Sequence, residues 1–311
     1  MRVNLEQAIA KLKNGEVVAI PTETVYGLAA DATNDDALRQ IFSVKQRPMD
    51  NPLIVHIADV AQVSDWAAEF SPLAQKLANA FWPGPFTLVL PAKNSVSNIL
   101  RGGQPTVALR VPNHALTLQL LQQSGLALAA PSANKFTQLS PTTAAHVTDS
   151  LGDEVPVLDG GACEVGIEST IVAVQGESWQ LLRLGMLPEA SIHAVAGVPS
   201  IEFKQGIKTP GQHQLHYSPR TPIQLFTTRA ELIAHANAHA YSQTSALLLG
   251  PGIVPNCAYF QLNNNANDVA QKLYDTLHKM DALNAEKLII ETPPNQPEWL
   301  AILDRLTRAA H

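Results

Sequence analysis

The chain has 311 residues, more than one compact core usually takes, and its 46% hydrophobic and 15% charged residues predict a globular protein of two domains. The net charge of −6 disfavours a protein that grips nucleic acid over a wide basic surface. No apolar run approaches the roughly 20 residues that cross a bilayer, and the amphipathic N-terminal stretch predicts a helix, not a signal peptide.

Helices and strands are predicted to alternate over the first 200 residues. Apolar residues at helical spacing predict helices over 5–15, 34–47 and 71–84. Asn4, Asn34 and Ser71 stand where these helices begin, and their short polar side chains are typical of helix caps. The predicted strands span residues 16–22, 52–58, 86–92, 106–112, 126–134, 155–161 and 168–174. Such interleaving indicates an α/β or α+β fold.

The composition changes near residue 204. From there to residue 223 the chain has no apolar periodicity and is rich in proline and glycine, which predicts a linker lying on another part of the protein. Strands are then expected over 222–226, 245–250 and 287–291, and helices over 229–240 and 267–283. This pattern predicts a small, Rossmann-like α/β domain, although no GxGxxG motif supports dinucleotide binding. We therefore expect domains over 1–200 and 223–311, joined by residues 201–222.

Polar side chains gather at the ends of the predicted strands of the first domain. Lys45 and Arg47 end a helix just before a strand, and Arg183 lies between apolar residues. In the strand over 106–112, Arg110 shares one face with a threonine and an alanine, while valines and a leucine take the other face. Cations beside hydroxyl and amide groups favour an anion-binding site.

These cations, hydroxyl groups and amides predict catalysis by binding anions and stabilising negative charge. The sequence has no zinc motif, no Walker lysine loop and no evident nucleophilic triad. Guanidinium groups grip phosphates and carboxylates, so an enzyme of phosphoryl or nucleotidyl transfer is the best match. Simpler interpretations stay open for each feature alone. Lys45 and Arg47 could only complement a helix dipole, His56 could be a core histidine, and the residues from Ser132 to Asn134 could form a plain turn.

Six motifs in order carry a family resemblance: PTETVYGL, KQRPMDNPLIVHI, WPGPFTLVL, VALRVPNH, PSANKFTQLSPTT and GIESTIV. Together they resemble the YrdC-like family over residues 15–187, in its long form with a linker and a C-terminal domain. The linker stretch TPGQHQLHYSPRTP also resembles the family's, with His216, Tyr217 and Pro219 matching and a threonine before Pro210. The resemblance implies a twisted, open mixed sheet around a large basic cavity.

The resemblance also implies a reaction. It indicates an enzyme that makes threonylcarbamoyl-adenylate from L-threonine, bicarbonate or CO2, and ATP, with release of pyrophosphate. Mg²⁺ is expected with the ATP. The product would pass to a separate complex that modifies tRNA, without stable nucleic-acid binding by this chain and without a membrane. The two cysteines, far apart in the sequence, favour a reducing cytoplasm.

Site residues follow from the same resemblance, position by position. The implied catalytic residues are Lys45, Arg47, Ser132 and Asn134. The implied threonine-binding residues are Thr24, His56, Arg110, Ala130 and Ser169. The implied ATP-binding residues are Arg47, Asn51, Thr106, Ser132, Ser140, Arg183 and Tyr217, with Tyr217 closing the cavity from the linker. Two alternatives remain: a carbamoyltransferase that works through carbamoyl-adenylate, and an RNA-binding module.

Overall fold

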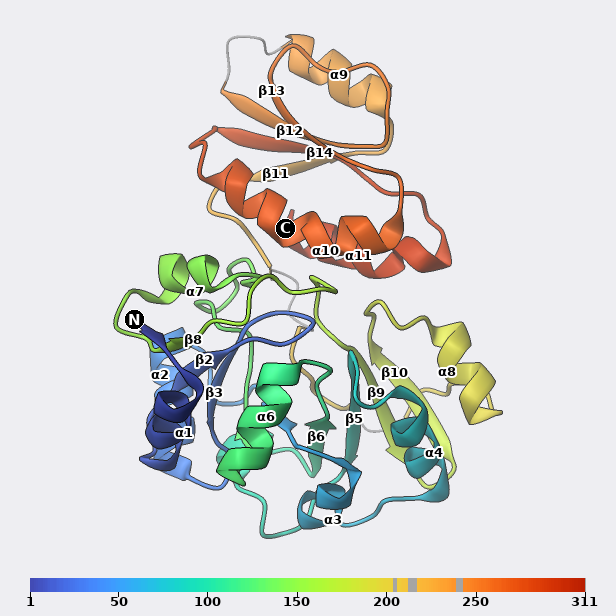
Figure 1. Ribbon diagram of the computed structural model, residues 1–311. Coiled ribbons are helices and arrows are strands. Elements are labelled where there is room, and N and C mark those ends of the chain that lie inside the picture. The colour runs from blue at the N-terminus through green and yellow to red at the C-terminus, as the bar shows by residue number, and fades with distance from the viewer. Residues whose placement is uncertain (204–205, 212–216, 239–242, 311) are drawn as a thin grey trace.

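A computed structural model describes residues 1–203, 206–211, 217–238 and 243–310. The chain forms two α/β bodies, one above the other, with the N-terminal body carrying the larger sheet (Figure 1). None of the described helices is both long and apolar enough to cross a membrane. The predicted fold class is confirmed: a mixed sheet in the first body and a smaller parallel sheet in the second.

The first body is built on a ten-stranded sheet with the order β1-β8-β2-β3-β7-β4-β6-β5-β9-β10. Parallel and antiparallel pairs alternate irregularly across it, so it is a mixed sheet. Its strands are β1 (Arg2–Val3), β2 (Val18–Ile20), β3 (Gly27–Asp31), β4 (Ile54–His56), β5 (Phe86–Pro91), β6 (Thr106–Arg110), β7 (Leu128–Ala129), β8 (Val157–Leu158), β9 (Thr170–Gln175) and β10 (Ser178–Arg183).

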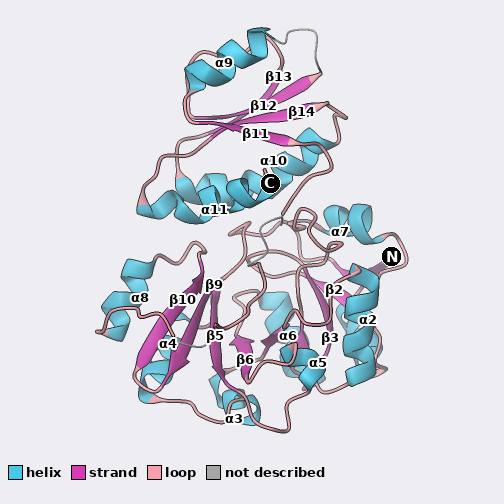
Figure 2. Cartoon of the chain, turned by 180° about the vertical axis from the view of Figure 1, so that it is seen from behind, coloured by secondary structure: helices cyan, strands magenta, loops and turns pink. Residues whose placement is uncertain are grey.

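Helices cover this sheet, as Figure 2 shows from behind. They are α1 (Leu5–Lys13), α2 (Asp35–Lys45), α3 (Val63–Trp66), α4 (Pro72–Phe81), α5 (Asn98–Arg101), α6 (Ala115–Ser124), α7 (Ala144–Leu151) and α8 (Glu189–Ala196), with a 3-10 turn at Val60–Gln62. The predicted caps are confirmed. Asn4 accepts a hydrogen bond from the backbone of Gln7, Asn34 caps α2, and Ser71 caps α4.

The second body is a four-stranded parallel sheet with the order β11-β14-β12-β13. Its strands are β11 (Ile223–Phe226), β12 (Thr244–Leu249), β13 (Ala258–Leu262) and β14 (Lys287–Glu291). Helix α9 (Arg229–Ala238) covers one face, while α10 (Ala266–Asp281), the 3-10 turn Pro297–Trp299 and α11 (Leu300–Ala309) cover the face turned toward the first body (Figure 1). The structure adds several elements to those expected from sequence: strands β1, β3, β10 and β13, and helices α3, α5, α6, α7, α8 and α11.

The two bodies share one apolar cluster. Val25, Leu139 and Ile167 of the first body pack with residues of α10 and α11. Tyr217 of the linker belongs to the same cluster and is 1% exposed. Between residues 197 and 222, the described part of the chain forms no helix or strand apart from a single bridge of Ser218 to Gln138. The domain limits proposed from sequence fall in this segment; its residues 204–205 and 212–216, among them His216 of the linker motif, lie outside the described part.

A pair of histidines also joins the bodies. The rings of His146 on α7 and His278 on α10 stack with their centres 4.0 Å apart. Asp275 lies 3.5 Å from His146, and Lys279, one turn further along α10, pairs with that aspartate. Burial, followed by the neighbouring His278, lowers the pKa of His146 to about 4. Both rings therefore face each other neutral at pH 7.

This stack predicts an acid-sensitive interface. Between pH 6.5 and about 4 the unfolded chain binds a proton at His146 that the folded chain excludes, so the free energy of unfolding falls as the pH falls. One such group contributes about 1.4 kcal/mol per pH unit in that window. The variant His146→Phe keeps a stacked ring and should lose less stability between pH 6.5 and 4.5 in urea unfolding. The control is His193→Phe, at an exposed position on α8; equal losses in wild type and His146→Phe would contradict the assignment.

Candidate active site

A cavity lies at the edge of the large sheet that faces the second body. His56 and Arg110 end the parallel strands β4 and β6 in register, so they stand side by side. Strand β9 begins at the same edge, since it runs parallel to β5, which is antiparallel to β6. Most of the sequence-predicted residues line this cavity: Thr24, Arg47, His56, Arg110, Ala130, Ser132, Ser169, Arg183 and Tyr217. Strand direction thus brings separate motifs to one place.

The linker occupies part of the cavity. Pro210, Gly211 and Tyr217 line it together with the residues of the sheet edge. About 50 Å³ remains in which a water molecule can be centred, well below the roughly 300–1,000 Å³ typical of a small-molecule pocket. A nucleotide and an amino acid therefore fit only if the linker shifts outward.

Arg110 is the cation at the floor of the cavity. It is 4% exposed, and its guanidinium lies 2.7 Å from a carboxylate oxygen of Glu23 and donates to the hydroxyl of Thr24 at 2.9 Å. A third contact, at 3.2 Å, goes to the backbone oxygen of Gly84. Burial by itself would raise the pKa of Glu23, but Arg110 outweighs it and holds the carboxyl below its ordinary pKa. Glu23 is thus a charged partner that sequence reasoning missed, although it lies inside the PTET motif.

His56 provides a neutral group beside Arg110. Burial, followed by the positive charge of Arg110, lowers the pKa of His56 to about 3. The imidazole consequently carries no charge at pH 7 and can donate or accept one hydrogen bond without competing for an anion. An amino acid held here would meet one cation and one neutral ring.

Arg183 and Ser169 form the opposite wall. The guanidinium of Arg183 donates to the backbone oxygen of Ser169 at 3.0 Å and to its hydroxyl at 3.0 Å. It also donates to the backbone oxygen of Pro210 in the linker at 3.2 Å. The Ser169 hydroxyl is 2.8 Å from that of Thr87 on β5. Arg183 therefore ties the beginning of β9 to the linker.

Arg47 is a third buried cation, 8% exposed. It donates to the backbone oxygen of Pro52 at 3.2 Å and lies 5.7 Å from the centre of the Phe136 ring. Burial lowers the pKa of Arg47 to about 10, so it is still charged at neutral pH. Three arginines, Arg47, Arg110 and Arg183, hence surround one small space.

Five of the predicted residues stand outside the cavity lining: Lys45, Asn51, Thr106, Asn134 and Ser140. The amine of Lys45 donates to the backbone oxygens of Ser132 and Asn134, each at 2.5 Å. Lys45 thus holds the loop that carries Ser132, and Asn134 braces that loop through the backbone oxygens of Lys135 and Gln138. Neither side chain points at the cavity space.

The other three lie further off for different reasons. Thr106 begins β6, so it is about 13 Å along the strand from Arg110. The Ser140 hydroxyl donates to the carboxylate of Glu168 at 2.6 Å. Asn51 is buried in the turn before β4. A direct contact of these side chains with a ligand requires a rearrangement.

The described residues contain no group of three or more histidine, cysteine, aspartate or glutamate side chains placed to hold a metal ion. The two carboxylates closest to the arginines, Glu23 and Glu168, are each paired with an arginine. A metal ion here would therefore take its oxygen ligands chiefly from a bound polyphosphate.

Two family models together match most of the chain. A family model described as "Telomere recombination" (Sua5, YciO and YrdC) matches residues 10–185, and one described as "Threonylcarbamoyl-AMP synthase, C-terminal domain" matches residues 186–311. The chain is 38% identical to the threonylcarbamoyl-AMP synthase of Bacillus subtilis, over 98% of this chain and 92% of the relative. It is 32% identical to that of Schizosaccharomyces pombe, over 99% and 88%.

A solved structure matches over both bodies. The crystal structure of Pyrococcus abyssi Sua5 complexed with L-threonine covers all of this chain, and the chain covers 96% of it, with a TM-score of 0.90 and 34% identity. The family models, the full-length relatives and the solved structure agree with one another. The chain belongs to the threonylcarbamoyl-AMP synthase family, in the long form that joins a YrdC-like domain to a C-terminal domain.

Proposed function

We propose that this protein synthesises threonylcarbamoyl-adenylate from L-threonine, bicarbonate or CO2, and ATP, and releases pyrophosphate. The observation that carries the proposal is the cavity in which Arg47, Arg110 and Arg183 converge beside a neutral histidine. Such a site suits two anions that must be drawn together, a carboxylated amino acid and a triphosphate. Relatives 32–38% identical over nearly the whole chain carry the synthase name.

Threonine would bind at the floor of the cavity. The guanidinium of Arg110 would take the amino-acid carboxylate, a charge-assisted pair in a buried place. Thr24 and His56 would contact the rest of the amino acid, and Ser169 with the backbone of Ala130 would complete the pocket. Because His56 is neutral at pH 7, it neither repels the amino group nor competes with Arg110 for the carboxylate.

ATP would bind across the arginines of the rim. Arg47, Ser132 and Arg183 line the cavity and would contact phosphates, with Tyr217 over the nucleotide. Lys45 and Asn134 would act by holding the Ser132 loop. Asn51, Thr106 and Ser140 stay predicted nucleotide contacts, made after the linker moves. Mg²⁺ would enter as the ATP complex, because both nearby carboxylates are already ion-paired.

The reaction follows from the charges. The deprotonated amine of threonine attacks CO2 and gives up a proton, or attacks bicarbonate with loss of water, and a carbamate forms in either case. A carbamate oxygen then attacks the α-phosphate of ATP, and pyrophosphate leaves. Because both reactants are negative, the barrier is largely electrostatic, and buried guanidinium groups lower it more than exposed ones would. Carbamate and mixed anhydride both hydrolyse, so a linker closed over the cavity would protect them from water.

The adenylate is a reactive product, so we propose that it passes to a separate tRNA-modifying complex without stable binding of nucleic acid by this chain. We also propose a cytoplasmic location. The cysteines fit a reducing compartment, since Cys163 and Cys257 are both free thiols.

A turnover assay tests the function. The purified chain is incubated with threonine, bicarbonate and Mg-ATP, and pyrophosphate is measured. We expect release that requires all three substrates, and an adenylated threonine derivative in the products. Pyrophosphate release that does not depend on threonine would contradict the proposal. Release that requires an added carbamoyl donor in place of threonine would favour carbamoyl-adenylate chemistry. Tight RNA binding without turnover would instead favour the binding module.

A further inference from the structure

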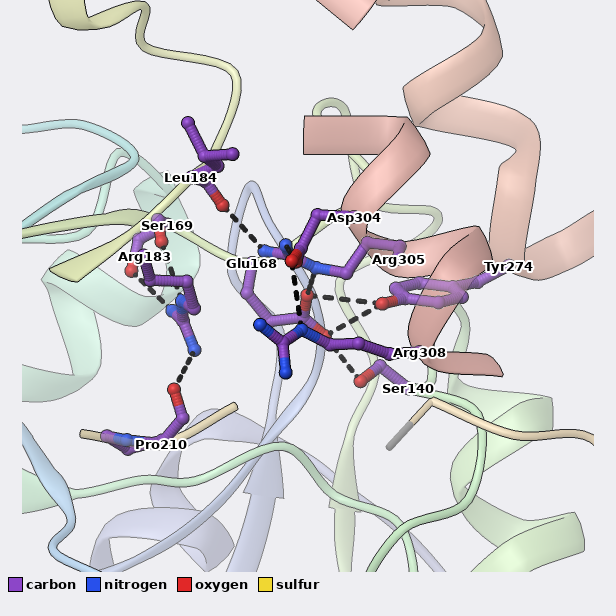
Figure 3. Close-up of polar contacts among 10 residues, drawn as sticks. All are labelled: Ser140, Glu168, Ser169, Arg183, Leu184, Pro210, Tyr274, Asp304, Arg305 and Arg308. Carbon is purple, nitrogen blue, oxygen red and sulfur yellow. Dashed lines mark hydrogen bonds and ion pairs between the residues drawn. The ribbon is translucent and has the colours of Figure 1, made fainter. Parts of the chain in front are cut away.

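A carboxylate on the cavity wall is held from the second body. Glu168 precedes Ser169, lines the cavity and is 6% exposed. Its oxygens accept hydrogen bonds from Ser140 at 2.6 Å, from Tyr274 of α10 at 3.2 Å and from Arg305 of α11 at 2.7 Å. Figure 3 shows these side chains meeting at the carboxylate. Two of the three partners come from the C-terminal body.

Arg305 also reaches the chain beside the opposite wall. It is 1% exposed, and besides Glu168 it donates to the backbone oxygen of Leu184 at 2.9 Å. Leu184 directly follows Arg183, just as Glu168 directly precedes Ser169. One guanidinium therefore fixes the chain neighbours of two cavity residues, at the end of β10 and at the beginning of β9.

The same guanidinium packs against the linker. The carbon at its centre lies 5.0 Å from the centre of the Tyr217 ring, and the rings of Tyr217 and Tyr274 are 6.0 Å apart. Arg305 consequently contacts the sheet edge and the linker at once, and its own side chain is buried.

The ion pair of Arg305 and Glu168 does more than hold the two bodies together, because it sets the charge of the cavity wall. Burial by itself would raise the pKa of Glu168, but Arg305, followed by Arg183, holds it below its ordinary value. The carboxylate is thus ionised on the wall of an anion-binding cavity. Without Arg305 it would repel phosphate and draw Arg183 away from the cavity toward itself.

We propose that Arg305, assisted by Tyr274, is a positioning residue of the active site. It neutralises Glu168 and thereby leaves Arg183 and Ser169 in place for the substrates. The C-terminal domain is then a structural part of the nucleotide-binding wall. This inference rests on the function proposed above, but its binding consequence does not require turnover.

A role in stability alone is the competing explanation, and charge removal separates the two. In Arg305→Met, kcat/KM for ATP should fall at least tenfold, and a non-hydrolysable ATP analogue should bind at least tenfold more weakly in calorimetry. The double variant Arg305→Met with Glu168→Gln removes both charges, which buried sites often tolerate. We expect it to recover most of the lost ATP affinity. Loss of packing alone would not be rescued by a change at Glu168.

The control is Arg308→Met on the same helix. Arg308 is 26% exposed and forms an ion pair with Asp304 at 2.9 Å. Asp304 also pairs with Arg305 at 2.7 Å. Arg308→Met leaves Arg305 both of its carboxylate partners, so wild-type kinetics are expected. Arg305→Met with the kinetics of this control would overturn the proposal, as would a folded double variant that binds the analogue no better than Arg305→Met. If Arg305→Met does not fold, the double variant decides alone. Failure of the proposed function would show instead as a wild type without threonine-dependent pyrophosphate release.

Discussion

Replacing Arg110 by alanine is expected to raise the KM for threonine about 100-fold and the KM for ATP less than threefold. A hundredfold change corresponds to about 2.7 kcal/mol, within the range of roughly 2–5 kcal/mol for truncating one partner of a buried, hydrogen-bonded charge pair. The asymmetry follows from position, because Arg110 lies beside Thr24 and His56 at the floor of the cavity. Steady-state kinetics with each substrate varied in turn measures both constants.

The experiment needs a variant in which Glu23 is neutral, because Arg110 is also the ion-pair partner of Glu23. Removing Arg110 alone would leave a buried carboxylate without compensation, at a cost of about 3–5 kcal/mol. The comparison is therefore made between Glu23→Gln and the double variant Glu23→Gln with Arg110→Ala. Equal increases in the two KM values would show that Arg110 does not belong to the threonine pocket.

Adding one methyl group at Gly211 is expected to lower kcat/KM for ATP at least tenfold. Gly211 has a φ of +90° and lines the cavity beside Tyr217. A Cβ at this position would overlap the Tyr217 hydroxyl oxygen and lie 3.2 Å from the Cδ atom of Arg183. Left-handed backbone costs a residue other than glycine about 1–2 kcal/mol, and the contact with Tyr217 adds to that. Gly211→Ala should therefore weaken the packing of the linker against the cavity.

The linker offers its own control. Gly206 has no atom within 4 Å of a built Cβ, so Gly206→Ala should keep wild-type kinetics. Gly206→Ala should melt at the wild-type temperature, and Gly211→Ala only a few degrees lower, since the two sheets are untouched. Chymotrypsin should cleave after Tyr217 faster in Gly211→Ala than in Gly206→Ala, because Tyr217 is 1% exposed when the linker is seated. Identical kinetics and cleavage in the two variants would contradict a closing role for the linker.

A substitution in the linker distinguishes the linker's contribution to activity from that of the C-terminal domain, whereas a truncation removes both. Cutting the chain near Gly206 should also reduce synthase activity strongly. That cut removes Arg305 and Tyr274 from Glu168 and uncovers Val25 and its apolar neighbours. Lost activity in such a truncation would therefore not identify which of these contacts matters.

Sequence patterns predicted much of the site because strand faces alternate. The two-residue period of a strand predicted that Arg110 lies on the face opposite to Val107 and Leu109, and these two residues do belong to the main core. The helix before His56 was predicted equally well, with its cap at Asn34. Lys45 shows the limit of such reasoning. A cation at a helix end resembles a phosphate ligand in sequence, but its amine meets two backbone oxygens of a loop 87 and 89 residues further on.

Strand β3 shows a second limit. Its sequence, GLAAD, holds small residues in place of the β-branched and aromatic ones that mark strands. Pairing with β2 and β7 makes it a buried central strand all the same. Helix α11 is amphipathic like many surface helices, and nothing in its spacing marks Arg305 as the partner of a carboxylate in the other domain.

The sequence by itself determined what depends on neighbouring residues: helix caps, strand faces and the ordered motifs that identify the family. Only the tertiary structure decided which strands run parallel, and so brought His56, Arg110 and Ser169 to one edge of the sheet. It alone paired Glu168 with Arg305, 137 residues away. The physical reason is that strand direction and the neutralisation of buried charge are set by contacts between distant segments, which local spacing does not record.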